Sequence, residues 1–188
     1  MIAHDPAAEP VDLTAHVVRA LVLYALAEVQ SGHATTLRVT VDGTAFSVAD
    51  DGRGHAIHRA IAGTPYLRFV YEHFAFPFEA GADAPVQLQG IGLSLVNALC
   101  SELTVTVANA DASLRLWFRE GRLERSEPGG AVAGGTGTTI AGTISPRLRP
   151  APADARQLEG WLLRVLAARP SLQLHFNGRR LQPPRDGG

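Results

Sequence analysis

The stretch Asp50-Asp51-Gly52-Arg53-Gly54 follows two short runs in which apolar and polar residues alternate. These runs, residues 37–41 and 46–48, flank Asp42-Gly43 and have the period of two that is typical of half-buried strands. Asp-Gly between such runs is a strong hairpin signal. The sequence therefore predicts a hairpin whose second strand ends in an acidic, glycine-rich turn. Taken alone, such a turn is also compatible with a simple surface loop.

A second glycine motif, Gln89-Gly90-Ile91-Gly92-Leu93, stands before a run with helical periodicity that continues to Cys100. Free backbone N–H groups and the helix dipole favour an anion at a helix N-terminus, so this arrangement is common in phosphate sites. It is equally common as a tight packing turn. A third motif, Thr136-Gly137-Thr138-Thr139, begins a strand-like run that ends at Ile144.

The remaining elements fall into separate groups of helices and strands. A helix is expected from the N-cap Asp12 to Ser31-Gly32, and residues 57–76 are expected to be partly helical. The later expected elements are strands at 103–107, 113–118, 122–125 and 138–144, a helix at 153–168 and a strand at 172–176. This segregation predicts an α+β fold, a two-layer sandwich of a mixed, mostly antiparallel sheet with helices on one face. We expect a loose lead-in over residues 1–11, a single domain over 12–182 and a disordered tail over 183–188.

The composition narrows the class of protein. The chain of 188 residues has a formal net charge of -1, so no basic stripe favours direct DNA binding. All 17 basic residues are Arg, so no lysine of this chain can contact a phosphate. No apolar run approaches the roughly 20 residues of a membrane span, and no secretion signal begins the chain. The single Cys100 is expected in the core, and we expect a cytoplasmic protein.

The joint order of the motifs is more specific than any one of them. A helix, a hairpin ending in residues 50–54, the segment Leu-Gln-Gly-Ile-Gly-Leu-Ser-Leu-Val-Asn-Ala-Leu at 88–99 and a Thr-Gly-Thr strand follow one another. In this order the chain resembles, from about His16 to Leu181, the ATPase domain of DNA gyrase B and topoisomerase IV. That superfamily, with its Bergerat-type ATP-binding fold, also contains histidine kinases, heat-shock chaperones and mismatch-repair ATPases. Residues 96–99 favour the topoisomerase branch.

The resemblance implies a site for an adenine nucleotide, with ATP or ADP as the ligand. Asp50 would accept a hydrogen bond from the adenine amino group, and Arg53 would lie beside the base and pair with Glu28. The implied nucleotide-binding residues are Asp50, Gly52, Arg53, Gly54, Gln89, Gly90, Gly92, Leu93 and Thr138. The implied pocket-lining residues are Ala20, Leu21, Tyr24, Ala25, Glu28, Val48 and Ile140.

The first helix departs from the family at two positions. Family members carry a glutamate that activates water and, four residues later, an asparagine that binds Mg²⁺. This chain has Ala20 and Tyr24 there, one helical turn apart. Alanine cannot accept a proton, and a phenol lacks the amide carbonyl that a hard cation prefers. We therefore expect no catalytic residue, no efficient hydrolysis and a site poorly suited to Mg²⁺.

Three functions are compatible with these residues. The domain could bind an adenine nucleotide without efficient hydrolysis. It could instead be a protein-interaction module with a vestigial site filled by the Tyr24 ring, its partner being a protein such as another topoisomerase chain. It could also be the ATPase component of a topoisomerase that works with a separate chain. His55 and His58 lack a third metal ligand nearby, so we expect both to be solvated loop residues.

Overall fold

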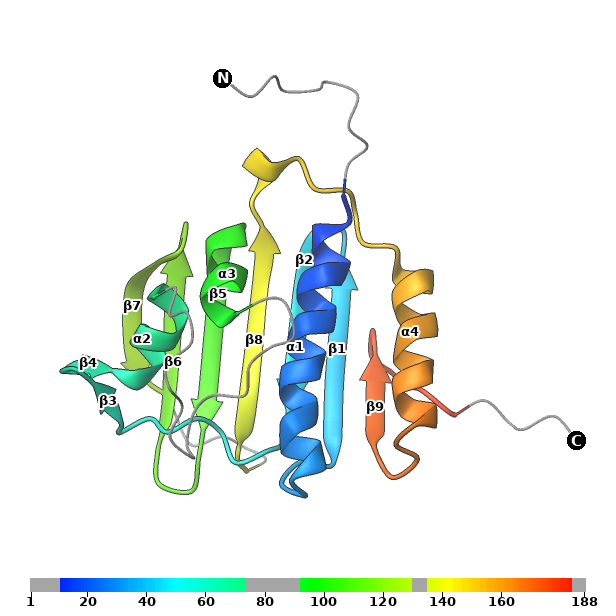
Figure 1. Ribbon diagram of the computed structural model, residues 1–188, viewed down its shortest axis with the longest axis horizontal. Coiled ribbons are helices and arrows are strands. Elements are labelled where there is room, and N and C mark those ends of the chain that lie inside the picture. The colour runs from blue at the N-terminus through cyan, green and yellow to red at the C-terminus, as the bar shows by residue number, and fades with distance from the viewer. Residues whose placement is uncertain (1–10, 74–91, 130–134, 184–188) are drawn as a thin grey trace, which may run out of the picture.

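The computed structural model describes residues 11–73, 92–129 and 135–183 (Figure 1). The helices are α1 (Leu13–Gln30), α2 (Tyr66–Glu72), α3 (Leu93–Leu99) and α4 (Ala155–Ala167), with a 3-10 turn η1 (Pro146–Leu148). The strands are β1 (Thr36–Asp42), β2 (Ala45–Asp50), β3 (Ala60–Ile61), β4 (Thr64–Pro65), β5 (Cys100–Ala108), β6 (Ser113–Arg119), β7 (Arg122–Pro128), β8 (Gly137–Ile144), β9 (Gln173–Phe176) and β10 (Arg179–Arg180).

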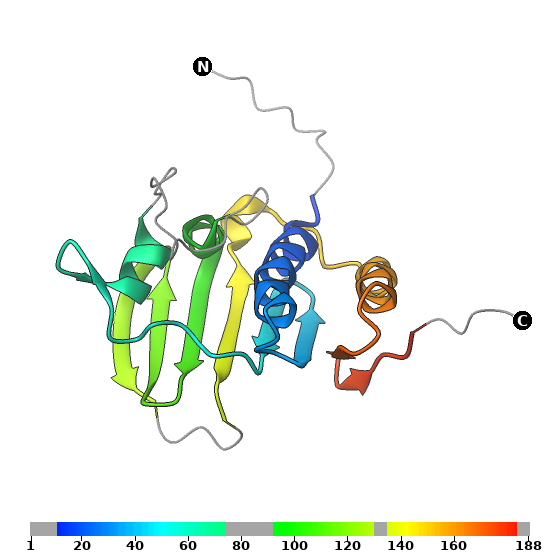
Figure 2. The ribbon, with the colours of Figure 1, turned by 60° about the horizontal axis from the view of Figure 1, so that its bottom comes forward.

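Eight of these strands form one sheet in the order β10-β9-β1-β2-β8-β5-β6-β7. Strands β1 and β9 run parallel, whereas the other neighbouring pairs of this sheet run antiparallel. The four helices lie on one face of the sheet (Figure 2). The predicted α+β class, a mixed and mostly antiparallel sheet with helices on one face, is confirmed.

Helix α1 lies across the centre of the sheet, and its sequence explains its bounds. The Asp12 side chain caps the first turn by accepting a hydrogen bond from the Ala15 backbone N–H at 2.8 Å. By length and hydropathy α1 could cross a membrane, contrary to the expectation from the apolar runs of the sequence. Half of its residues are buried inside the protein, Val17, Val18 and Val22 completely so. The apolar composition of α1 is therefore that of a core helix.

The β1–β2 hairpin carries the first glycine motif to the middle of the sheet. Asp42 pairs with Ala45, so the two-residue turn is Gly43-Thr44, one residue later than Asp42-Gly43. Gly43 takes the left-handed conformation there, with φ of 58°. This register places Val39 opposite Val48, both buried beneath the helices.

The described part of the region 57–76 is partly helical, as predicted. The helix is α2, and the segment before it forms the two-residue strands β3 and β4. Ala62 and Gly63 make their turn with φ of 47° and 81°, which no helix tolerates. The chain therefore changes direction before Pro65 and starts the helix at Tyr66.

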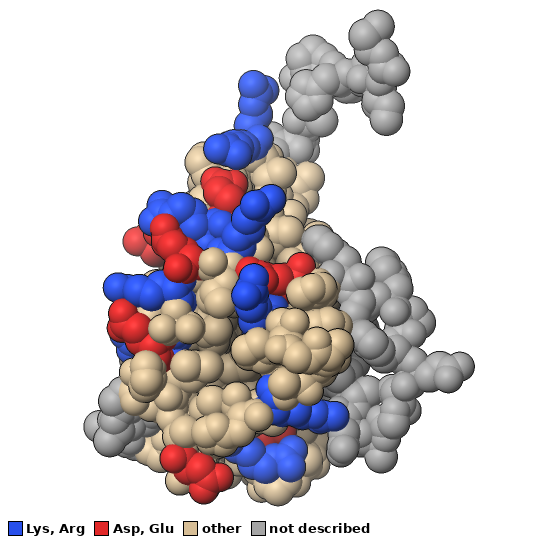
Figure 3. Space-filling view, turned by 90° about the vertical axis from the view of Figure 1, so that its left-hand side faces the viewer, with Lys and Arg blue, Asp and Glu red and all other residues tan. Residues whose placement is uncertain are grey.

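The outer edge of the sheet, strands β6 and β7, carries charged side chains of both signs (Figure 3). Arg119 pairs with Glu102 at 3.1 Å and with Glu124 at 3.2 Å, and the Arg125 guanidinium lies 3.8 Å from the Trp117 ring centre. Interleaved charges of this kind discourage another strand from pairing with an exposed edge. Among the residues described, this edge mixes arginine with glutamate instead of gathering a basic stripe.

Candidate functional site

The candidate site begins at Asp50, the last residue of β2, near the centre of the sheet. Asp50 pairs with Thr138 on β8, and two residues earlier Val48 pairs with Ile140. Residues directly opposite each other in a sheet share one face, so Asp50 and Thr138 lie on the side covered by α1. Val48, Ile140 and Thr138 are all buried there. The fold thus places one carboxylate among apolar side chains.

Burial decides the electrostatics of Asp50. It raises the pKa of this carboxyl from 3.8 to about 6, and the negative charge of Glu28 acts in the same direction. Backbone N–H groups of Gly52 and Thr138 oppose the rise, the first donating to Asp50 Oδ1 at 2.8 Å. Asp50 is therefore ionised at neutral pH, and it is a strong hydrogen-bond acceptor in a poorly solvated place.

The backbone passes so close to Asp50 at Gly52 and Gly137 that neither position has room for a side chain. A Cβ atom on Gly52 would lie 2.8 Å from Asp50 Oδ1 and 2.9 Å from Glu28 Oε2. Gly137 has φ of 148°, and a Cβ there would collide with the Asp50 carbonyl oxygen. Gly54, at φ of 73°, passes equally close to a backbone carbonyl of β5. Side chains at these positions would displace the carboxylate or the strand that carries it.

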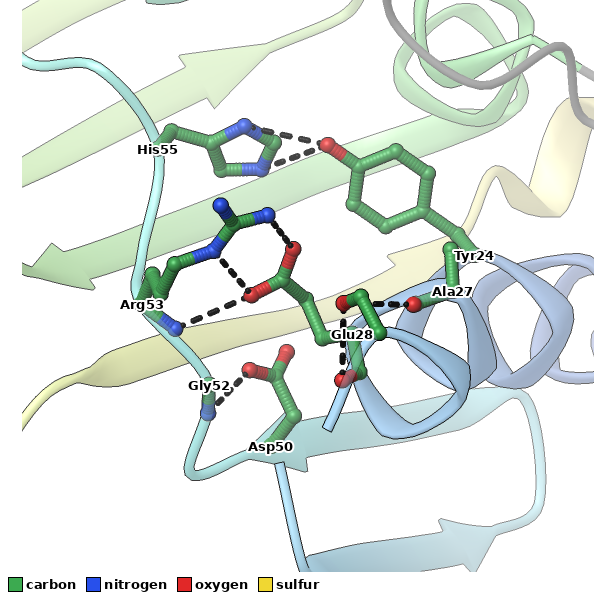
Figure 4. A network of polar contacts seen from close by, with 8 residues as sticks. Tyr24, Ala27, Glu28, Asp50, Gly52, Arg53 and His55 are labelled. Carbon is green, nitrogen blue, oxygen red and sulfur yellow. Dashed lines mark hydrogen bonds and ion pairs between the residues drawn. The ribbon is translucent and has the colours of Figure 1, made fainter. Parts of the chain in front are cut away.

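Glu28 ties the loop after β2 to helix α1 (Figure 4). Its carboxylate accepts hydrogen bonds from Arg53 Nη2 at 2.9 Å, from Nε at 3.2 Å and from the Arg53 backbone N–H at 3.1 Å. The hydrogen bonds from Arg53 lower the pKa of Glu28. The expected Glu28–Arg53 ion pair is thus present, while its place beside an adenine base stays a prediction.

Tyr24 and His55 meet above this ion pair (Figure 4). The Tyr24 hydroxyl lies 3.0 Å from the His55 ring nitrogens, and the two rings stack with centroids 5.4 Å apart. Desolvation lowers the pKa of His55 to about 4 and raises that of Tyr24, so both rings are neutral at pH 7. The expectation of a solvated loop histidine is wrong for His55, because the Glu28–Arg53 link brings its loop onto α1. His58 is exposed.

No protein-family model matches the chain, but individual proteins and a solved structure are similar to it. The DNA gyrase B protein of Mycolicibacterium smegmatis is 33% identical over 142 residues, which are 71% of this chain and 20% of that protein. The DNA gyrase B protein of Mycobacterium tuberculosis strain H37Rv is 34% identical over 134 residues, which are 66% of this chain and 19% of that protein. The chain spans about a fifth of the length of these curated relatives.

A solved structure shares the whole arrangement of layers. The 43K ATPase domain of Thermus thermophilus gyrase B, in complex with an aminocoumarin, superimposes with a TM-score of 0.72 and 24% identity. The match covers 88% of this chain and 44% of that one. The fold is that of a gyrase B ATPase domain. The resemblance found in the motifs is therefore confirmed.

The two positions of α1 that depart from the family pattern lie one turn apart. Ala20 is buried, and Tyr24 packs partly buried against the core. Neither side chain carries a carboxylate or an amide. Within the described ranges, no group of three or more His, Cys, Asp or Glu side chains could hold a metal ion.

Of the second glycine motif, Gln89 and Gly90 lie outside the described residues. Gly92 is the residue before α3, and Leu93 is buried in the core. Leu21 and Ala25 are buried on α1, and their role in lining a pocket stays a prediction.

Three polar residues near the site carried no signal in the sequence. Asp51 accepts hydrogen bonds from the backbone N–H groups of Thr35 at 2.7 Å and Thr36 at 2.8 Å, which fixes the end of the hairpin. The Tyr66 ring lies 6.4 Å from the His55 ring, and Tyr71 is buried against the sheet. Tyr71 follows Leu67 at helical spacing, which is more often a core pattern than a site.

Proposed function

We propose that this gyrase B-type domain binds an adenine nucleotide, or a similar adenine-containing ligand, at Asp50 without hydrolysing it efficiently. The observation that carries the proposal is the partly buried Asp50 carboxylate, held by the Gly52 N–H and paired in register with the buried Thr138. A carboxylate accepts hydrogen bonds, and the exocyclic amine of adenine donates them. The similarity to gyrase B, whose 43K domain is described as an ATPase domain, supports the same ligand class.

The same chemistry discriminates between purines. A base with a carbonyl oxygen in place of the amino group would set one acceptor against another, and both would be desolvated. Unpaired polar groups in a buried site are costly, so such a ligand is rejected strongly. We therefore expect adenine compounds to bind and guanine compounds to bind much more weakly.

The proposed loss of hydrolysis rests on α1. Ala20 offers no proton acceptor, and the Tyr24 hydroxyl is engaged by His55. The single carboxylate on this helix, Glu28, accepts three hydrogen bonds from Arg53. A general base must reach the proton that it removes, and none of these groups is available for that task. Mg²⁺ is accordingly not part of the proposal.

One observation favours a second candidate, a protein-interaction module with a vestigial site. Tyr24 and His55 are joined by a hydrogen bond and a ring stack within the protein itself. A domain stabilised in this way needs no ligand to keep its shape. Its partner would be a protein, such as another topoisomerase chain.

Ligand-induced stabilisation separates the two candidates. Adenine compounds and an aminocoumarin should raise the melting temperature of the protein, because a ligand that binds only the native state stabilises it. Asp50→Ala should abolish the effect, whereas Asp42→Ala removes an exposed carboxylate of the same hairpin and should leave it intact. No rise with any adenine compound would favour the interaction module.

Hydrolysis is tested separately by phosphate release from ATP with Mg²⁺, with an active gyrase B ATPase domain as the positive control. We expect no release above background. Turnover that disappears in Asp50→Ala would overturn the second half of the proposal and indicate a working ATPase component.

A further inference from the structure

Four neutral polar side chains gather on the helix side of the sheet, near Asp50. Tyr24 and His55 are joined by a 3.0 Å hydrogen bond, and Tyr66 lies with its ring 6.4 Å from that of His55. Tyr71 comes from the next turn of the helix that begins at Tyr66. We call these four residues the tyrosine–histidine cluster. Each side chain offers a hydroxyl or a ring nitrogen and no charge.

Tyr71 is the informative member. Its side chain is almost fully buried, at 1% exposure, with its ring 5.4 Å from that of Phe118 on β6. Its hydroxyl has no hydrogen-bond partner among the described residues. It is close enough to Tyr24, Tyr66 and Asp50 for all three to raise its pKa, after burial itself. A buried hydroxyl without a partner is rare and calls for an explanation, of which a missing ligand group is one.

Positive charge is scarce around the same place. Arg53 is held by Glu28, and Arg59, which is exposed, lies with its guanidinium 5.7 Å from the Tyr66 ring centre. The described residues hold no metal-binding group that could supply charge instead. A chain of phosphates would lose its water here without gaining a sufficient counter-charge.

We infer that the site selects adenine ligands with few or no phosphates, adenosine foremost, and that the tyrosine–histidine cluster hydrogen-bonds the ribose. The inference rests on the proposed function, because Asp50 must first bind the base. Ribose hydroxyls both donate and accept, as tyrosine hydroxyls and a neutral imidazole do. Such a surface can hydrogen-bond the hydroxyls of a sugar, but it offers no positive charge to a polyphosphate.

Titration calorimetry with adenine, adenosine, AMP, ADP and ATP, each with and without Mg²⁺, tests the selection. Adenosine should bind at least about tenfold more tightly than ATP, because the phosphates would add negative charge to a site that already contains Asp50 and Glu28. Mg²⁺ should not reverse the order. AMP and ADP should fall between these limits.

Tyr71→Phe tests the hydroxyl by opposite effects on stability and binding. Removing an unpaired buried hydroxyl should leave the melting temperature of the free protein unchanged or raise it. The affinity for adenosine should nevertheless fall about fivefold or more, while adenine, which lacks the sugar, keeps its affinity. Ser145→Ala is the matched control, because Ser145 also carries a buried hydroxyl without a partner but lies after β8, outside the cluster. It should not change adenosine binding.

The possible failures are distinguishable. If ATP binds as tightly as adenosine, and Asp50→Ala abolishes both, the proposed function stands and the selection is refuted. If Tyr71→Phe leaves adenosine affinity unchanged, the cluster does not bind the ribose. If no adenine compound binds at all, the proposed function and this inference fall together.

Discussion

Asp50→Asn should stabilise this domain while weakening its adenine site. The substitution keeps an oxygen at the position that accepts the Gly52 N–H, which lies 2.8 Å from Oδ1. It removes the charge that burial makes costly. The amide cannot present two acceptor oxygens, so the hydrogen bond from an adenine amino group should be weakened or lost.

The size of the gain follows from the titration of the carboxyl group. Burial raises the pKa of Asp50 from 3.8 to about 6, and each pH unit of difference corresponds to about 1.4 kcal/mol. The ionised group therefore destabilises the native state by about 3 kcal/mol above pH 6. Burying the new amide N–H₂ group costs about 1 kcal/mol of this gain. The variant should be more stable by about 2 kcal/mol at pH 7.5.

The sign of the pH dependence follows from the direction of the shift. Between pH 3.8 and about 6 the native carboxyl holds a proton that the unfolded carboxyl has lost. The destabilisation is thus complete above pH 6 and disappears as the pH falls through 6 towards 3.8. At pH 4.5 about 1 kcal/mol of it remains, which the buried amide offsets, so the two proteins should be about equally stable.

Urea unfolding of both proteins at pH 7.5 and pH 4.5 measures this difference. The buried His55, with its pKa lowered to about 4, titrates in the same range but is common to both proteins and cancels. A variant no more stable than the parent at pH 7.5 would refute the argument that Asp50 is buried and charged. A stability difference that is the same at both pH values would do so as well.

Three further substitutions test the geometry. Gly52→Ala places a methyl group 2.8 Å from Asp50 Oδ1, so stabilisation by adenine compounds should be lost in thermal shift; a normal response would show that the carboxylate need not stay in place. Gly160→Ala, in the middle of α4 with nothing within 4 Å of the new methyl, should raise the free energy of unfolding by about 0.5–1 kcal/mol in urea and leave ligand binding unchanged. Leu162→Ala, fully buried on α4, should lower it by about 2–5 kcal/mol, and a loss below 1 kcal/mol would contradict the packing described for this helix.

Local chemistry explains why so much of the fold could be predicted from the sequence. The cap at Asp12, the alternation in β1 and β2 and the glycines around Asp50 each depend on neighbours within a few residues. The errors arise where tertiary packing decides. The hairpin turns at Gly43-Thr44 instead of at Asp42-Gly43, in the register that pairs Val48 with Val39 on β1 and with Ile140 on β8.

The residues of the site differ in how far the sequence could predict their positions. Asp50, Gly52 and Thr138 belong to strand ends whose pairing follows from the hairpin and from β8, so a motif in the sequence could place them. His55 could not be placed, because its position depends on the Glu28–Arg53 link between a loop and a helix 25 residues apart. The role of Tyr71 could not be predicted from the sequence for another reason. Its spacing from Leu67 is that of a core residue, and only the geometry shows a hydroxyl without a partner.

The structure gives Tyr24 a role that its position in the sequence did not indicate. In the sequence it stands only where the family has a metal-binding asparagine. In the structure it has a partner 31 residues away, and the two rings are neutral, stacked and hydrogen-bonded. Restoring the family residues through Ala20→Glu and Tyr24→Asn would leave His55 without its hydroxyl partner and would add a second carboxylate to α1, about two turns from Glu28. We therefore expect that this double substitution destabilises the domain and does not by itself produce ATP hydrolysis, which phosphate release and urea unfolding would measure.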